Sequence, residues 1–395
     1  MKIKYKLLPK YKKIGQYTFW LGIYFLTLIV GALRIGTFGS LLKVLAFIPI
    51  LIWITKKHSF KKSNIIRAAV PFAFWCFISI IWSINFSASF ERGKTQILFL
   101  IMLLSADGYA FNEEEIDYLK NCLVWSSRIT AILALLSADF VDGRMYLNGI
   151  VQEDPNYLCA YFLFAIVSNV YFIMNKDIDK IRKFVGAVEL LVYAYILLGT
   201  GSRGGMFATI TSIAVIILTY KDKSGVASGL IKKIAIILML YLAYYFASMF
   251  LDADIMQRFT AEAISESNGT GRYDLWKDAI NAFNNSTFFR QLVGYGTATV
   301  RDITYLFPFS RHNVVHNIFV ENLIEIGSIG VVFYVLHIGI FLYVAIKNMY
   351  RYALPILAGM IVLSLSTSLY AFKPYWNILL FILCLSNSEN GDNSF

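Results

Sequence analysis

The stretch Arg311–Ile346, RHNVVHNIFVENLIEIGSIGVVFYVLHIGIFLYVAI, joins a group of reactive side chains to a long apolar run. His312 and His316 are four residues apart, as are Glu321 and Glu325, so on a helix each pair would share one face. The spacing predicts a short amphipathic helix at a membrane surface, followed by a helix that spans the membrane. Two of the chain's four histidines, His312 and His316, lie ahead of the apolar run. Because histidine changes charge near neutral pH, the stretch is a candidate site of chemistry.

The composition around this stretch is that of an integral membrane protein. Hydrophobic residues make up 58% of the chain and charged residues 15%, against about 25% charged in soluble domains; the mean hydropathy is +0.61. The apolar runs are continuous and helix-length, unlike the short alternating segments of outer-membrane barrels. The basic start MKIKYKLLPKYKK precedes an apolar run long enough to remain as a span, which predicts that no leader is cleaved.

These runs predict an all-α, polytopic membrane helical bundle formed by residues 1–395 as a single integral membrane domain. One large outer loop, residues 251–327, is expected to contain short amphipathic helices. About twelve spans are expected, near 17–33, 36–54, 65–84, 95–106, 119–137, 157–174, 184–200, 205–220, 229–250, 328–346, 352–370 and 375–386.

The basic residues predict the orientation of these spans. With the N-terminus inside, 22 Lys and Arg side chains fall in cytoplasmic segments and 12 in outer segments, so both termini are expected in the cytoplasm. Inside, 19 of the 22 are Lys, whereas outside 9 of the 12 are Arg. Arginine presents a planar fork that binds phosphate or carboxylate with two hydrogen bonds. Compositional drift is the alternative, but the pattern favours an anionic ligand on the outer face.

Two outer segments carry polar residues next to spans. Asp154-Pro155-Asn156 has the composition of a helix start, because Asp and Asn cap helices and Pro fits the first turn. The sequence LLGTGSRGGMFA interrupts an apolar run at 199–205, where glycines permit a sharp turn. An arginine between two apolar spans, here Arg203, is costly unless it is paired or bound, so it is a site candidate. A tight turn with this arginine extended to lipid phosphates is the alternative.

The large outer loop contains a predicted amphipathic helix at Tyr273–Asn284, followed by a turn at 294–297. Arg272 stands at the start of this helix, where a cation opposes the helix dipole. The position therefore favours anion binding over a purely structural role, although a pairing with Glu266 or Asp274 remains open.

Signals for metal or nucleotide chemistry are weak. Asp252 and Asp254 have a DxD spacing, and His312 and His316 have the spacing of two helical ligands without the glutamate of HExxH. Each pattern is short and common by chance, so no metal and no cofactor are expected. Nucleotide-binding and hydrolase motifs are missing from the sequence. Its four cysteines lie in or beside apolar runs without CxxC spacing, which predicts buried, inert thiols.

The order of the motifs resembles one known family. A DPN precedes a span, GSRGG separates two spans, GRYDLW and GYGT lie in the large loop, and HNxxxENLIEIGSIG leads into a span. This order resembles the O-antigen ligase/polymerase family, which comprises Wzy-type polysaccharide polymerases and lipopolysaccharide ligases. The resemblance implies a catalytic core at 185–345 that includes the outer loop.

The resemblance also implies a chemistry. Members are inverting, metal-independent glycosyltransferases whose donor is a glycan on undecaprenyl diphosphate. It implies that Arg203 and Arg272 bind the diphosphate and that His316 is the essential histidine. This agrees with the residues themselves, since a departing diphosphate needs fixed cations and an attacking sugar hydroxyl needs a base. Further candidates for substrate contacts are Ser202, Arg144, Asn156, Arg301, Arg311, His312, Asn317 and Glu321.

Within that family the sequence favours a polymerase of O-antigen, capsule or exopolysaccharide repeat units. The alternatives are a ligase that transfers the glycan to the lipid A-core and, from another class, a transporter of lipid-linked oligosaccharide. A transporter predicts internal repeats, which the sequence lacks, and charged residues within spans, of which Lys43, Arg128 and Glu189 are examples. The expected setting is the bacterial inner membrane with the active site on the periplasmic face. The expected partners are the bilayer, the lipid-linked oligosaccharide and a chain-length regulator, but no nucleic acid.

Overall fold

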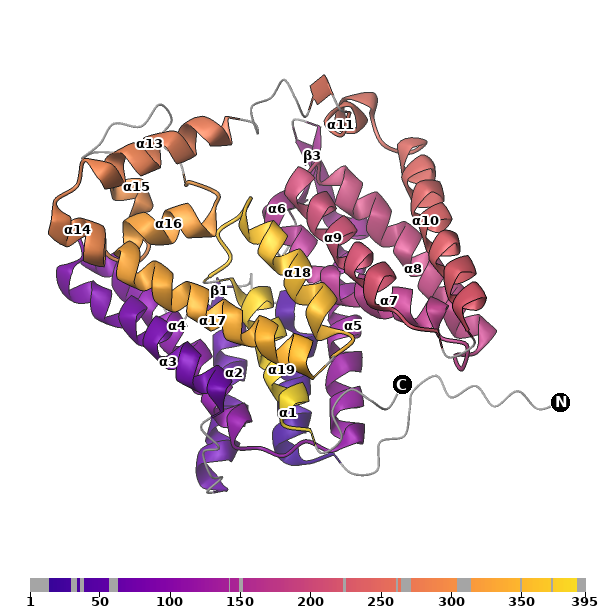
Figure 1. The fold of residues 1–395 in the computed structure, drawn as a ribbon, viewed down its shortest axis with the longest axis horizontal. Helices are drawn as coiled ribbons and strands as arrows, with labels where there is room; N and C mark the ends of the chain where they lie inside the picture. The colour runs from indigo at the N-terminus through magenta and orange to yellow at the C-terminus, as the bar shows by residue number, and fades with distance from the viewer. Residues whose placement is uncertain are drawn as a thin grey trace.

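The computed structural model describes residues 14–29, 34–35, 39–56, 63–141, 143–148, 152–222, 225–260, 262–263, 271–303, 314–348, 350–370 and 372–388. A helix or bent helix pair occupies each predicted span (Figure 1). The helices are α1 Gln16–Leu26, α2 Leu41–Thr55, α3 Asn64–Ile78, α4 Phe86–Asp107, α5 Glu113–Ser137, α6 Pro155–Leu158, α7 Leu163–Met174, α8 Lys180–Gly199, α9 Arg203–Thr219, α10 Val226–Ser248, α11 Ala253–Gln257, α13 Arg272–Asn284, α14 Phe288–Val293, α15 Val300–Ile303, α16 Ile318–Glu325, α17 Gly327–Lys347, α18 Ala353–Ser364 and α19 Lys373–Ser386.

Four of these helical segments are long and apolar enough to cross a membrane: Asn64–Trp82, Glu113–Ser137, Val226–Ser248 and Gly327–Lys347. A fifth is added if the pair Pro155–Tyr161 and Leu163–Met174, bent by 41°, is one span. The protein is therefore a multi-pass helical membrane protein, and the number twelve stays a prediction. Helix α4 shows why counting is difficult, because it is 22 residues long but carries charged side chains in its first half.

Helix α19 lies at the centre of the bundle. Every side chain from Pro374 to Leu385 is buried, which is expected of a helix that is apolar on all sides. Helices α4, α5, α17 and α18 pack against it, while α9 packs on α18 and α3 packs on both α4 and α17. The bundle therefore has a protein-filled centre, with the exposed apolar side chains of α10 on its periphery.

The all-α prediction is corrected by two small antiparallel sheets. The strands β1 Arg34–Ile35 and β2 Gly39–Ser40 pair with each other, and β3 Ala138–Val141, β4 Arg144–Asn148 and β5 Gln152–Glu153 form the second sheet. In β4, Met145 and Leu147 are buried while Tyr146 between them is half-buried. This two-residue alternation is the signature of a strand, but here it covers too few residues to stand out in an apolar chain.

Helices α13 to α16 form a compact unit over one end of α17 (Figure 1). Two glycines let the backbones approach closely. Gly294 has a φ of +76° and Gly327 a φ of +69°. An added Cβ would lie 2.3 Å from the Glu325 carbonyl oxygen in the first case and 2.2 Å from the Leu292 carbonyl oxygen in the second. Any larger residue at either position would force α14 away from α16 and α17.

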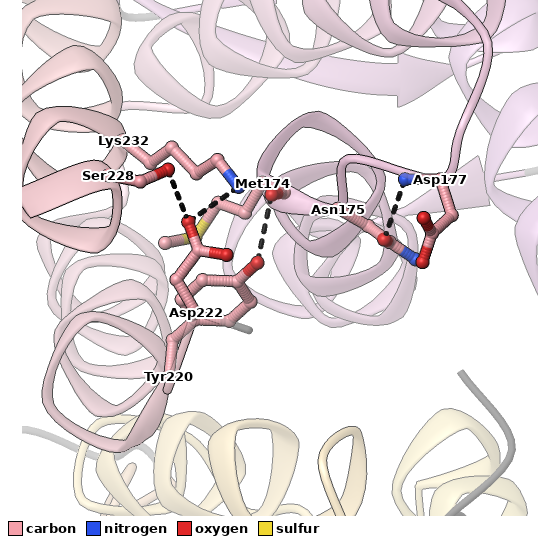
Figure 2. Close-up of polar contacts among 7 residues, drawn as sticks. All are labelled: Met174, Asn175, Asp177, Tyr220, Asp222, Ser228 and Lys232. Carbon is pink, nitrogen blue, oxygen red and sulfur yellow. Dashed lines mark hydrogen bonds and ion pairs between the residues drawn. The ribbon is translucent and has the colours of Figure 1, made fainter. Parts of the chain in front are cut away.

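Polar contacts join the C-terminal ends of α7 and α9 to the start of α10 (Figure 2). The Lys232 Nζ lies 2.7 Å from Oδ2 of Asp222, to which the Ser228 hydroxyl also donates at 2.7 Å. The Tyr220 hydroxyl donates to the Met174 carbonyl at 2.8 Å. These bonds fix the loop after α9 against its neighbours. A cavity of about 250 Å³ lies at this end.

Two charged residues within the predicted spans pair with each other. Arg128 Nη2 lies 2.8 Å from Glu189 Oε1, and the Asn169 side-chain amide donates to Glu189 Oε2 at 2.8 Å. Burial of a charge within a bundle is tolerated when a partner neutralises it. The pair therefore has a structural explanation that needs no transported substrate.

Candidate active site

The break between α8 and α9 is a tight turn built on glycine. Gly201 has a φ of +61°, in the left-handed region that glycine adopts without strain, and an added Cβ would lie 2.9 Å from Nε of Arg258. Ser202 occupies the N-cap of α9, and its hydroxyl accepts from the Gly205 N–H at 3.2 Å. The predicted glycine break is confirmed, and it places Arg203 in the first turn of α9.

Arg203 connects this turn to the segment after α10. Its Nε donates to the Arg258 carbonyl at 2.7 Å, and its Nη2 donates to the Ala263 carbonyl at 3.0 Å. The Nε of Arg258 donates back to the Gly201 carbonyl at 3.3 Å. Carbonyl oxygens orient a guanidinium group but carry no formal charge. The turn and the segment therefore hold two arginines side by side.

Arg144 joins the same turn to the DPN segment. Its Nε donates to the Thr200 carbonyl at 2.9 Å, and its Nη2 donates to Oδ1 of Asn156 at 3.1 Å. Asp154 is the N-cap of α6 and accepts from the Asn156 N–H at 2.8 Å, so the predicted cap is confirmed. The strand, the cap and the glycine turn, which are far apart in sequence, thus meet at one place.

Arg272 faces this group from the large loop. It is the first residue of α13, after Gly271 with a φ of +75°. Burial lowers the pKa of Arg272, and so do the positive charges of Arg144, Arg203 and Arg258, while Asp154 acts in the opposite direction. Four guanidinium groups are therefore close enough to repel one another. An anion bound among them would relieve that repulsion.

His316 sits between the arginine group and α16 on a short irregular segment. Its backbone has a φ of +54°. The preceding carbonyl, of Val315, accepts from the indole N–H of Trp276 at 3.0 Å, and the following residue, Asn317, caps α16 through a bond from the Phe319 N–H at 3.0 Å. The predicted helix containing His316 is wrong, because the Asn317 cap starts α16 two residues after the histidine.

The surroundings of His316 keep its imidazole neutral. Burial and the positive charges of Arg272, Arg301 and Arg144 lower its pKa to about 4. The negative charge of Asp154 raises the pKa but does not outweigh them. A neutral imidazole can accept a proton at neutral pH, which is the first requirement of a general base. The arginines that surround the ring also provide the positive field that a departing anion needs.

A cavity of about 300 Å³ adjoins this segment. Val314 and Arg301 line it, and Arg301 also acts electrostatically on His316, so the cavity and the histidine are neighbours. The other lining residues come from α4, α6, α15, α16 and the segments before α15 and α19; they are Arg92, Tyr157, Ala298, Val300, Glu321, Glu325 and Ser368.

The two glutamates of α16 do share a face, as their spacing predicts. Glu325 accepts from the N–H groups of Ala298 at 2.8 Å and Val300 at 3.1 Å, and also from the Tyr370 hydroxyl. Glu321 accepts from the Ser368 hydroxyl at Oε2. Burial raises the pKa of Glu321 to about 8, and the negative charge of Glu325 adds to the effect. Glu325 therefore fixes the backbone before α15, while Glu321 borders the cavity.

The predicted candidates divide into two groups. The structure gathers most of them, namely Arg203, Arg272, His316, Arg144, Asn156, Ser202, Arg301, Asn317 and Glu321, around the arginines and the adjoining cavity. Arg311 and His312 lie outside the described residues. The structure adds Arg258, Arg92, Tyr157 and Ser368, and of these the two arginines were marked in the sequence by their predicted outer position. It also brings in Asp154 and Glu325, which the sequence marked as a helix cap and as one of a helical pair.

Other predicted features have structural explanations. Asp252 is the N-cap residue of α11. Among the described residues, no three His, Cys, Asp or Glu side chains are grouped as metal ligands. The prediction of buried thiols is confirmed, since Cys76, Cys122, Cys159 and Cys384 are all free and buried. An arginine that is predicted to lie outside can also be structural: Arg290 donates to the Trp82 carbonyl at 2.8 Å.

Residues 188–335 match the family model described as O-Antigen ligase. No curated protein matches the chain. The matched region includes the glycine turn, the arginines at 203, 258 and 272, His316 and both glutamates of α16. The match confirms the predicted resemblance: residues 188–335 of this chain form a domain of the O-antigen ligase/polymerase family.

Proposed function

We propose that the protein is a polysaccharide polymerase that joins undecaprenyl-diphosphate-linked repeat units on the periplasmic face of the bacterial inner membrane. The family consists of glycosyltransferase-like enzymes that act on lipid-linked glycans, which supports the reaction class. The observation that carries the proposal is a group of four arginines, Arg144, Arg203, Arg258 and Arg272, two of which also act on the neutral His316.

In the proposed reaction, an acceptor hydroxyl oxygen attacks the anomeric carbon of the donor sugar. The bond from that carbon to the diphosphate oxygen breaks, and its electron pair stays on the departing undecaprenyl diphosphate. Arg203 and Arg272 bind the diphosphate, because fixed guanidinium groups stabilise charge that develops in the transition state. His316 takes the proton of the attacking hydroxyl. Attack opposite to the leaving group inverts the anomeric configuration.

His316 has a low proton affinity in the free protein, and binding of the donor would raise it. The diphosphate of the donor brings negative charge to the arginines that lower the pKa of the imidazole. Donor binding therefore raises the proton affinity of the ring at the moment when a base is needed. In this scheme the base is neutral before the donor binds and becomes stronger in the complex.

A ligase remains the second candidate because the matching family model is itself described as O-Antigen ligase. The two functions share a donor and differ in the acceptor. A deletion strain separates them: loss of a polymerase leaves single repeat units on the lipid core, whereas loss of a ligase leaves a bare core and polymer still attached to its lipid carrier. For the polymerase, a membrane protein that regulates chain length is the expected partner.

The direct test uses purified protein in liposomes with synthetic lipid-linked repeat units. His316→Ala should reduce turnover by about 10²–10⁴, the usual cost of removing a general base. Donor binding should persist through Arg203 and Arg272. EDTA should have no effect on the wild type. Full turnover in His316→Ala would remove the base assignment, and inactivation by EDTA would show that the reaction needs a metal.

A further inference from the structure

The cavity of about 300 Å³ beside His316 is built differently from the arginine group. The arginine group consists of four guanidinium groups and one carboxylate, that of Asp154. The cavity instead mixes two carboxyl groups, two guanidinium groups and two hydroxyl-bearing residues. Proteins bind sugar hydroxyls through such mixtures of donors and acceptors at fixed positions. The chemistry of the cavity is therefore suited to an uncharged polyol rather than to a diphosphate.

The two carboxyl groups have different amounts of their hydrogen-bonding capacity in use. Glu325 is fully buried and accepts two backbone N–H bonds and one hydroxyl bond. Glu321 is 3% exposed, and among the described residues its hydrogen bond is the one from Ser368. A buried carboxyl group normally satisfies more of its capacity than this. Glu321 thus has an oxygen available to a ligand in the cavity.

The position of the cavity fits an acceptor in the proposed reaction. Val314 lines it two residues before His316, and Arg301 both lines it and acts on the imidazole. Tyr157, which directly follows Asn156 in α6, also lines the cavity, and its hydroxyl donates to the Ser368 carbonyl at 3.3 Å. A sugar held here would lie beside both the segment that leads to His316 and the DPN segment.

We propose that this cavity is the acceptor-sugar site and that Glu321 positions the attacking hydroxyl toward His316 by hydrogen bonding. The ligand class is a pyranose with free neighbouring hydroxyl groups at the non-reducing end of the acceptor glycan. The inference rests on the proposed function and deepens it. Arg92 and Arg301 donate to further sugar oxygens, and Ser368 holds the Glu321 side chain in place.

The test separates acceptor from donor by using a soluble acceptor. The donor is the lipid-linked repeat unit purified from a strain that lacks this protein, and the acceptor is the same repeat-unit oligosaccharide released from its lipid. Glu321→Gln should raise the KM for the soluble acceptor by about 10- to 100-fold, because it replaces a carboxyl contact in a buried site. The KM for the donor should stay within about twofold.

Glu115→Gln is the matched control. Glu115 is also a buried glutamate, but it belongs to the capping box of α5, which accepts Gln as well as Glu. This variant should keep both KM values. Should Glu321→Gln fail to fold, Ser368→Ala tests the same site through the residue that holds Glu321, with an increase of about tenfold in the acceptor KM expected.

Binding of the soluble oligosaccharide, measured by calorimetry on the purified full-length protein, keeps this inference separate from the proposed function. Binding that Glu321→Gln abolishes, without any turnover by the wild type, supports the acceptor site and overturns the polymerase. Turnover by the wild type with an unchanged acceptor KM in both Glu321→Gln and Ser368→Ala overturns the acceptor site and leaves the polymerase intact.

Discussion

The two ends of the bundle both carry many cations, but they arrange them in different ways. At one end, lysines lie against carboxylates: Lys232 Nζ is 2.7 Å from Asp222 (Figure 2). Lys120 and Asp117, which line the cavity at the same end, lie 2.5 Å apart. At the other end, Arg144 and Arg258 donate to carbonyl and amide oxygens. Neutral acceptors orient an arginine without cancelling its charge, so these two arginines keep a full positive charge for a ligand, whereas Lys232 and Lys120 are each balanced by a carboxylate.

The difference indicates two roles for basic residues in one protein. Lysines paired with carboxylates hold helix ends together, and their excess sets orientation in the membrane. Arginines held by neutral groups are already in position for an anion, so binding costs little reorganisation. The kind of cation and the charge of its acceptor distinguish the two ends better than the number of cations does.

The largest expected effect is topological, since the two ends should lie on opposite sides of the membrane. Lys176 and Lys277 are both exposed, one at each end. In intact cells an impermeant maleimide should label Lys277→Cys fully and Lys176→Cys only after permeabilisation. The four native cysteines are buried and serve as the background. Labelling of Lys176→Cys alone in intact cells would reverse the proposed orientation.

Replacement of arginine by lysine should be next in size. Arg272→Lys and Arg203→Lys keep the charge but lose the two-pronged hydrogen bond, so each should reduce turnover by about 10² at normal protein level. Lys221→Arg, at the cavity of the opposite end, is the control and should keep turnover. Wild-type rates in both arginine variants would mean that charge alone, and not the fork, is needed.

A smaller effect is expected on the pH dependence. His316 has a pKa of about 4 because of burial and the nearby arginines, so kcat/KM for the donor should hold down to about pH 5 and fall toward pH 4 as the imidazole gains a proton. Arg301→Gln removes one positive charge and should move this acid limb to higher pH. Lys221→Gln should leave it in place. An acid limb near pH 6.5 in the wild type would contradict the electrostatics of the site.

The smallest effects concern stability, and they should have opposite signs at the two ends. Asp222→Asn breaks a partly buried ion pair and should lower the unfolding free energy by about 1–3 kcal/mol. Arg272→Gln removes one of several like charges and should leave the melting temperature unchanged or higher. Tryptophan fluorescence during heating of the detergent-purified proteins measures both. A loss of stability in Arg272→Gln similar to that in Asp222→Asn would mean that the arginine end is also structural.

The sequence predicts those parts of this structure that depend on local patterns. Apolar runs locate the helices, the DPN segment caps α6, and the glycines at 199–205 separate α8 from α9. Each of these features depends on a few neighbouring residues. The amphipathic pattern at 273–284 finds α13 to within one residue.

What the sequence does not predict depends on tertiary contacts. Arg92, Tyr157 and Ser368, from three other segments, line the same cavity as Glu321. No local sequence pattern predicts that these segments come together. The strand β4 is too short for its alternation to be noticed. His316 lies outside the helix that its spacing predicts, because Asn317 caps α16. The hydrogen bonds of a capping side chain can end a helix where the apolar periodicity continues, so periodicity alone does not locate the boundary.

The left-handed backbone of His316 has a consequence for how this protein would evolve. A φ of +54° costs a residue with a side chain about 1 kcal/mol or more, whereas glycine adopts it freely. Selection for expression or solubility alone should therefore replace histidine by glycine at this position. Selection for surface polysaccharide should retain it. A laboratory population grown under each regime would reveal, by deep sequencing of codon 316, which of the two demands has kept the histidine in place.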